Sequence, residues 1–162
     1  MKKQRRVSRS RRIKGKTNYH KRLILLKSES PRLIVRKTNR YIILQVVESN
    51  EAQDKVLFSV NSKELLKYGW PNEKSGSLKS LSAAYLSGFL IGKKSKNELN
   101  KRIVLDTGLI PSTKGSRVYA VVKGLVDSGI EINFNEKVIP KMDKIEKLEF
   151  FNNVKETINN GI

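Results

Sequence analysis

The chain has 162 residues, a length that suits one ordinary domain with short tails. It holds 34 Lys or Arg against 15 Asp or Glu, and the formal net charge of +19 favours a polyanionic partner. Without Cys and with one His it cannot form disulfides or a Cys/His zinc site, and without a long apolar run we expect a soluble, cytosolic protein with no membrane partner.

The first 22 residues form a basic arm. They contain too few apolar groups to bury, and we expect the arm to be disordered alone in water. Residues 1–40 hold 16 Lys or Arg and one acid, Glu29, so most of the net charge lies here. Cations interleaved with groups that hydrogen-bond or stack are typical of RNA-binding arms. The candidate RNA-binding residues of this segment are Arg5, Arg6, Arg9, Arg11, Arg12, Lys14, Gly15, Lys16, Thr17, Asn18, Tyr19 and Arg22.

A β-hairpin is expected to hold further cations in fixed positions. From Thr17 the pattern predicts a short capped helix, and two β-branched runs at residues 32–37 and 41–47 then predict the hairpin. Because side chains alternate along a strand, Arg32 and Arg36 share one face. The RNA-binding candidates of the hairpin are Arg32, Arg36, Lys37, Thr38, Asn39, Arg40 and Tyr41.

The remaining chain alternates between predicted strands and helices. We first expect a strand at 55–61, a short helix from Ser62 that breaks at Gly69 and Pro71, and then a flexible loop. A helix at 78–94, a short strand at 102–108, a helix from Ser116 to a stop at Gly129, and a strand at 130–134 are expected to follow. This order predicts an α/β fold, a mixed β-sheet flanked by helices.

The stretch from residue 105 to 124 contains the outlines of two enzyme motifs. Asp106-Thr107-Gly108 is the triplet of aspartic proteases, but those enzymes need two such carboxylates and the triplet occurs once. We therefore expect Asp106 to cap or brace the next loop. A Walker loop needs Gly-x-x-x-x-Gly-Lys-Ser/Thr, whereas here Lys114 precedes Gly115 and the first Gly is missing.

The same loop also has a non-catalytic interpretation. The segment STKGSR precedes a predicted helix N-terminus, where free amides together with Lys114 and Arg117 could hold one backbone phosphate. A plain capped loop without a ligand is the alternative.

Four blocks of the chain, in order along residues 5–140, resemble one family. They are GKTNYHKRLILLKSESPRLIVRKTNRYIILQVVE, NSKELLKYGW, AAYLSGFLIGKK and LDTGLIPSTKGSRVYAVVKGLVDSG. These blocks look like the 5S-rRNA-binding protein of the large ribosomal subunit, the universal family numbered eighteen, in its archaeal and eukaryotic branch. Two stretches depart from the family pattern: the loop after Trp70 is more polar and charged than usual, and the tail from Lys141 carries little family signal.

The resemblance implies a ribonuclease H-like arrangement without its catalytic acids, no enzymatic activity, no cofactor and no small-molecule substrate. It also implies binding to 5S rRNA, contact with 23S rRNA and neighbouring large-subunit ribosomal proteins, and a place in the central protuberance of the cytoplasmic ribosome. The segments at 15–19 and 31–42 match the family's RNA-facing blocks, and PSTKGSR matches a family loop.

Two other functions stay open at this stage. A ribonuclease H-like nuclease needs clustered carboxylates for two metal ions, but Asp106, Asp127 and Glu48 are expected at separate places, so we assign no catalytic or metal-binding residue. A nonspecific DNA-binding protein fits the charge, although a folded hairpin bearing Asn and Tyr favours shaped RNA.

The domain limits expected from these patterns are a basic RNA-binding arm at 1–22, an α/β globular domain at 23–140, and a C-terminal helical tail or extension at 141–162. Whether that tail contacts protein or RNA stays open.

Overall fold

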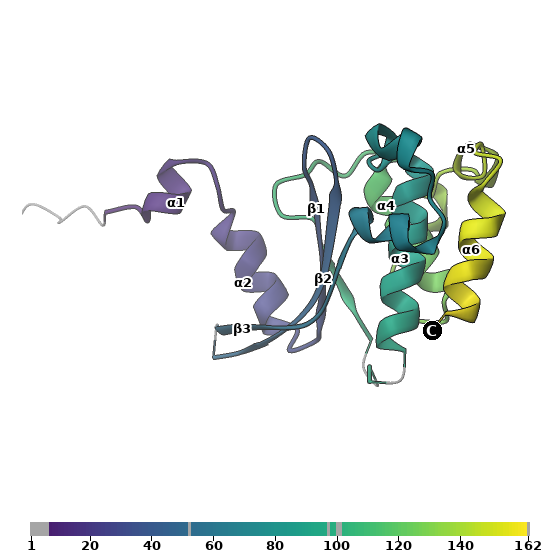
Figure 1. Ribbon diagram of the computed structural model, residues 1–162. Coiled ribbons are helices and arrows are strands. Elements are labelled where there is room, and N and C mark those ends of the chain that lie inside the picture. Colours follow the sequence, from purple (N-terminus) through teal and green to yellow (C-terminus); the bar gives the residue numbers. More distant parts are fainter. Residues whose placement is uncertain (1–6, 52, 97, 100–101, 162) are drawn as a thin grey trace, which may run out of the picture.

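A four-stranded mixed sheet lies at the centre of the computed structural model, which describes residues 7–51, 53–96, 98–99 and 102–161. The strand order is β3-β2-β1-β4 (Figure 1). The strands β1 (Arg32–Lys37), β2 (Ile42–Asn50) and β3 (Gln53–Asn61) are antiparallel neighbours, and β4 (Val104–Asp106) pairs in parallel with β1. The predicted hairpin, third strand and mixed sheet are confirmed.

Alternation along the strands gives the sheet two different faces. Leu33 and Val35 of β1 and Leu44 of β2 are at most 1% exposed and belong to the hydrophobic core. Burying side chains of this size stabilises the fold by about 1.5–3 kcal/mol each. The opposite face of β1 carries Arg32 and Arg36, so the two faces of one short strand serve different purposes.

Two helices cover the apolar face. They are α3 (Leu81–Ser95) and α4 (Arg117–Asp127), and they lie on the same side of the sheet in Figure 1. The Ser80 side chain accepts a hydrogen bond from the backbone N–H of Ala83 and so caps α3. α3 is buried over most of its surface, because the sheet, α4 and the C-terminal helices all pack against it.

α3 and α4 cross at two glycines. A methyl group on Gly88 would overlap the backbone carbonyl of Val121, and one on Gly124 would overlap the carbonyl of Tyr85. The two backbones can approach this closely only because neither position carries a side chain.

The basic arm contains two helices. α1 (Ser10–Ile13) is one turn, and α2 (Tyr19–Lys27) begins after Asn18, whose side chain accepts hydrogen bonds from the backbone N–H groups of His20 and Lys21 at 3.1 Å. α2 lies on the side of the sheet opposite α3 and α4 (Figure 1). The capped helix is confirmed, and residues 10–13 are also helical. That the arm is disordered alone in water stays a prediction; residues 1–6 lie outside the described part of the chain.

Two expectations for the loops are also corrected. The segment after Trp70 is not a flexible loop but the 3-10 helix η2 (Asn72–Ser77), which follows η1 (Ser62–Tyr68). The Trp70 indole N–H donates to the carbonyl of Lys74 at 3.2 Å and ties η2 to the core. Residues 130–134 are not a sheet strand, because they make only an isolated bridge between Ile132 and Ile103.

The C-terminal tail packs back onto the domain. After η3 (Glu136–Val138), the helices α5 (Met142–Ile145) and α6 (Phe151–Asn160) lie against α3, and α6 also contacts η1. Phe151, Val154 and Ile158 form the buried stripe of α6. The Phe150 ring meets the Trp70 ring edge to face, with ring centroids 4.9 Å apart. Of the two forms expected for the tail, the structure has the terminal helix.

The close crossing of α3 and α4 predicts a stability effect. We expect Gly124→Ala to destabilise the fold by about 2 kcal/mol, since the added methyl group forces two packed backbones apart. Gly76→Ala is the matched control, because a Cβ there meets no atom within 4 Å. Urea unfolding followed by circular dichroism measures both, and equal midpoints for the two variants would contradict the packing argument.

Candidate RNA interface

Five charged side chains form a continuous row across the sheet face opposite α3 and α4. The Arg22 Nη2 of α2 lies 3.1 Å from Asp54 Oδ2 on β3. The other carboxylate oxygen of Asp54 lies 2.7 Å from Arg32 Nη2 on β1. Arg32 Nη1 is 3.4 Å from Asp106 Oδ2 on β4, and Asp106 Oδ1 is 3.5 Å from Arg36 Nη2. We call this set the ion-pair row; it joins α2, β3, β1 and β4.

Arg32 is the centre of the ion-pair row and is the largest fully buried side chain. Its side chain is 1% exposed. Its Nη2 donates to Ser49 Oγ at 2.7 Å, and Ser49 Oγ in turn donates to Asp54 Oδ1 at 2.6 Å. A buried guanidinium is tolerated only when carboxylates and hydrogen bonds replace its water. From the sequence, Arg32 belongs with the surface RNA-binding cations; the structure corrects this, because its guanidinium is enclosed.

Asp54 is held in its charged form by the same contacts. Partial burial acts to raise its pKa, but the hydrogen bond from Ser49 and the charges of Arg32 and Arg22 outweigh that effect. The pKa of Asp54 therefore lies below its ordinary value. A carboxyl group with a lowered pKa stabilises the folded state above its unfolded pKa, and that stabilisation is lost as the pH falls through the folded pKa.

Asp106 braces the loop that follows β4. Its Oδ1 accepts a hydrogen bond from the backbone N–H of Gly108 at 2.8 Å, and its backbone carbonyl accepts one from Arg36 Nη1 at 3.0 Å. The expected bracing role of Asp106 is confirmed. Arg36 also donates from Nη1 to the carbonyl of Val35 at 2.9 Å, so this guanidinium is fixed although its side chain is 42% exposed.

The cations of the arm lie on the surface with their backbone partly fixed. The Arg9 guanidinium stands 4.7 Å from the centroid of the Tyr19 ring. Arg11 Nε donates to Thr17 Oγ1 at 2.9 Å. The exposed cations among the described residues of the arm are Arg9, Arg11, Arg12, Lys14, Lys16 and Lys21. Arg5 and Arg6 lie outside the described residues.

The hairpin tip is a second group of exposed polar side chains. Thr38 Oγ1 donates to the carbonyl of Tyr41 at 2.8 Å and accepts from the N–H of Tyr41 at 2.9 Å, which closes the turn. Lys37, Asn39 and Arg40 are exposed around it. The turn therefore presents these side chains on a fixed backbone.

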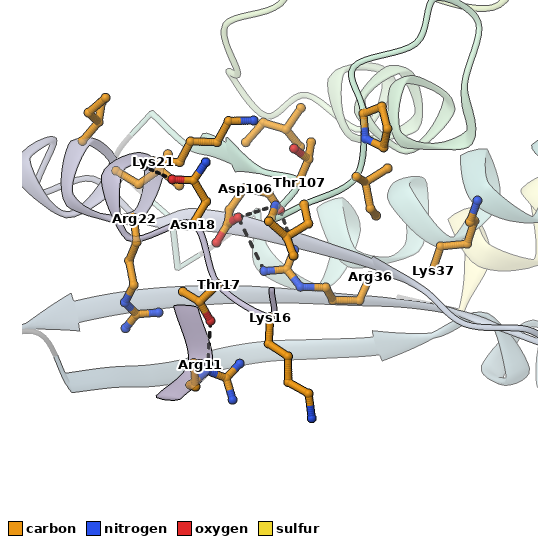
Figure 2. A pocket seen from close by; sticks show the side chains of 17 residues that line it. Arg11, Lys16, Thr17, Asn18, Lys21, Arg22, Arg36, Lys37, Asp106 and Thr107 are labelled. Atoms are coloured by element: carbon orange, nitrogen blue, oxygen red, sulfur yellow. Dashed lines mark hydrogen bonds and ion pairs between the residues drawn. The ribbon is translucent and has the colours of Figure 1, made fainter. Parts of the chain in front are cut away.

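A cavity of about 790 Å³ lies between the arm, the end of β1 and the loop after β4. Figure 2 shows the Arg36 guanidinium turned toward Asp106 and the Arg11 guanidinium joined to Thr17. Its lining residues are Arg11, Lys16, Thr17, Asn18, Lys21, Arg22, Ile24, Leu25, Arg36, Lys37, Leu105, Asp106, Thr107, Gly108, Leu109, Ile110 and Pro111.

The part of this loop nearest α4, residues 112–116, does not line the cavity. Lys114 is exposed and Arg117 is half-buried, and neither lines the cavity. The backbone N–H of Gly115 donates to the carbonyl of Val138 at 2.8 Å, so this amide already has a partner. Ser112 and Tyr119 are joined by a hydrogen bond between their hydroxyls.

Several lining residues were not predicted from the sequence. Lys21 was not among the candidates, although it lies one helical turn from Asn18 and Arg22 follows it. The apolar lining residues Leu105, Leu109, Ile110 and Pro111 were not recognised as part of a site, because apolar residues near the end of a strand are expected in the core. Asp54 was missed because nothing local marks it as the partner of Arg32.

Comparison with known proteins gives the family. The model for "Ribosomal large subunit proteins 60S L5, and 50S L18" matches residues 3–102 and 95–135. The large ribosomal subunit protein uL18 of Korarchaeum cryptofilum is 47% identical over 135 residues, which are 83% of this chain and 67% of that protein. The uL18 of Methanoregula boonei is 42% identical over 84% of this chain and 76% of its own length. The chain belongs to the uL18 family of large-subunit ribosomal proteins.

Membership of the uL18 family settles the class of function. The relatives are structural proteins of the ribosome, so the protein is a ribosomal constituent and not an enzyme. The nuclease interpretation has no support. The uL18 match ends at residue 135, before α5 and α6. Within the described part of the chain, no helix is long and apolar enough to cross a membrane.

The ion-pair row predicts an acid-sensitive element of stability. We expect Asp54→Asn to destabilise the protein at pH 7 by about 3 kcal/mol, because a buried guanidinium loses a charged partner. The difference from wild type should shrink as the pH falls below about 3.9, the unfolded pKa of Asp, because the carboxylate of the unfolded wild-type chain then takes up a proton. It should vanish as the pH falls through the lowered pKa of folded Asp54.

Glu131→Gln is the control for that comparison. Its ion pair with Arg102 is long, at 3.7 Å, and both side chains are more than half exposed. We expect no change in stability at either pH for this variant. Urea titrations at a series of pH values measure the free energy of unfolding of both variants. If Asp54→Asn lowers it by the same amount at every pH, the negative charge of Asp54 does not stabilise the fold.

Proposed function

We propose that this protein binds 5S rRNA and helps attach it to 23S rRNA in the central protuberance of the cytoplasmic ribosome, in contact with neighbouring large-subunit proteins. Membership of the uL18 family supports a role in the ribosome. The observation that carries the RNA contact is the ion-pair row, because it fixes α2 against the sheet and so places the arm beside the end of β1.

The proposed RNA-binding surface has two parts with different physical properties. The arm supplies exposed cations that neutralise phosphates, which gives affinity for any RNA. The hairpin tip supplies Lys37, Asn39 and Arg40 on a closed turn, where fixed side chains can test the shape and exposed bases of one RNA. Lys114 on the loop before α4 and Arg117 at the start of α4 form a third contact. Arg32 has no place in this surface, since it is buried.

The first test of this function is a competition experiment. We expect the protein to prefer 5S rRNA over duplex DNA and over tRNA of similar length at physiological salt, because the tip presents hydrogen-bonding groups in one arrangement. Filter binding with each nucleic acid as competitor measures the preference. Equal affinity for all three would refute the proposal and favour nonspecific binding through charge.

A second experiment separates the arm from the tip. Deleting residues 1–14 removes eight cations, namely Lys2, Lys3, Arg5, Arg6, Arg9, Arg11, Arg12 and Lys14. If about half of them contact phosphates, the slope of log K against log salt becomes shallower by roughly 3 to 4, and selectivity persists. Asn39→Ala with Arg40→Ala should instead lower the preference for 5S rRNA while the slope changes by about one unit.

Both variants are measured against 5S rRNA and a mixed RNA competitor over a salt series. Loss of selectivity in the arm deletion, with selectivity retained in the tip variant, would place recognition in the arm and contradict this division.

A further inference from the structure

The cavity beside the arm is lined by both apolar and charged side chains. Its apolar wall is formed by Ile24 and Leu25 of α2 together with Leu109 and Ile110 of the loop after β4. Its lining also includes six cations, Arg11, Lys16, Lys21, Arg22, Arg36 and Lys37, and one carboxylate, Asp106. That carboxylate is already paired with Arg32 and Arg36. The cavity therefore favours a ligand with an apolar part and a negative part.

The Arg36 guanidinium forms a fixed flat surface at this cavity. A Cβ on Gly108 would lie 3.1 Å from Cζ and Nη1 and 3.2 Å from Nη2 of Arg36. Nearly equal distances to three atoms of one plane put Gly108 over the face of the guanidinium and not at its edge. Two carbonyls accept from Nη1, and Asp106 Oδ1 accepts from Nη2. Gly108 covers one face of the Arg36 guanidinium, so a ligand can stack only on the other face.

Gly108 is required for this arrangement. Its φ is +60°, a conformation that residues with a side chain adopt only at a cost in strain. A side chain there would also press on the guanidinium. The loop after β4 thus holds Arg36 against its own backbone, while the Arg36 side chain stays 42% exposed.

We propose that this cavity binds a single unstacked nucleotide of the ribosomal RNA, with its base on the open face of Arg36 and against the apolar wall, and its phosphate among Arg11, Lys16 and Lys21. RNA is recognised by such splayed bases, which stack on Arg planes and apolar side chains. The volume of about 790 Å³ falls in the range of small-ligand pockets. The excess of cations favours a nucleotide over an apolar peptide. The inference rests on the proposed function, since it requires rRNA as the partner.

The first test fills the cavity without changing its charge. Leu109 is 53% exposed on the apolar wall, and we expect Leu109→Trp to weaken 5S rRNA binding about tenfold, the size expected for loss of one stacked base. The salt slope should not change, because no cation is removed. The matched control is Asn152→Trp, an exposed position on α6 at the far side of the sheet, which should bind like wild type. Wild-type affinity in Leu109→Trp would overturn the inference.

The second test locates the nucleotide directly. Ultraviolet cross-linking of the full chain to 5S rRNA and, separately, to fragmented 23S rRNA should attach a nucleotide to the peptide that contains residues 105–111 or to the one that contains Ile24 and Leu25. A cross-link there to 23S rRNA alone supports the cavity site and contradicts 5S binding through it. Cross-links confined to the hairpin tip, or a peptide of a neighbouring protein attached at this cavity in intact subunits, would overturn the inference.

Discussion

The buried guanidinium of Arg32 is the contact on which the proposed RNA-binding side of the protein depends. It lies between two carboxylates from different strands, Asp54 on β3 and Asp106 on β4, and each carboxylate has a second task. Asp54 holds α2 through Arg22, and Asp106 holds Arg36 and the loop after β4. Because a buried charge without partners is strongly unfavourable, these two carboxylates, together with Ser49, hold the Arg32 guanidinium in the interior.

This constraint separates the molecule into two sides. On one side of the sheet, apolar residues of β1 and β2 pack against α3, and the crossing of α3 with α4 is tight enough to require glycine at two positions. On the other side the same strand carries arginines, and α2 lies beside this face of the sheet (Figure 1). The core supplies most of the stability, while the charged side supplies the fixed geometry on which the proposed RNA recognition depends.

The tail packs on the side of the sheet that carries α3 and α4, and not on the side that we propose binds RNA. Its helix α6 buries Phe151, Val154 and Ile158 against α3 and η1, and Phe150 meets Trp70. The match to the family model ends at residue 135, so α6 lies outside the matched region. The helix that is most enclosed in the fold, α3, owes that burial to the tail as well as to the sheet and α4.

The sequence by itself determined the class of fold and the general nature of the partner. β-Branched alternation marked the hairpin, helical spacing marked α3 and α4, and the concentration of Lys and Arg near the N-terminus marked a polyanion-binding arm. These features are local, because they depend on which residues follow one another. The family blocks were equally visible, since they are strings of residues in order.

Tertiary structure alone decided which charged residues are surface and which are interior. Arg32 and Arg36 are the same residue type and lie on the same face of β1. Yet the Arg32 side chain is 1% exposed and the Arg36 side chain is 42% exposed. The difference comes from Asp54 and Ser49, which the β2–β3 pairing brings over Arg32, 22 and 17 residues away in sequence. The cavity likewise needs α2 and the loop after β4 side by side, and no pattern within either segment specifies that contact. Charge is a property of the residue, but burial depends on the whole fold.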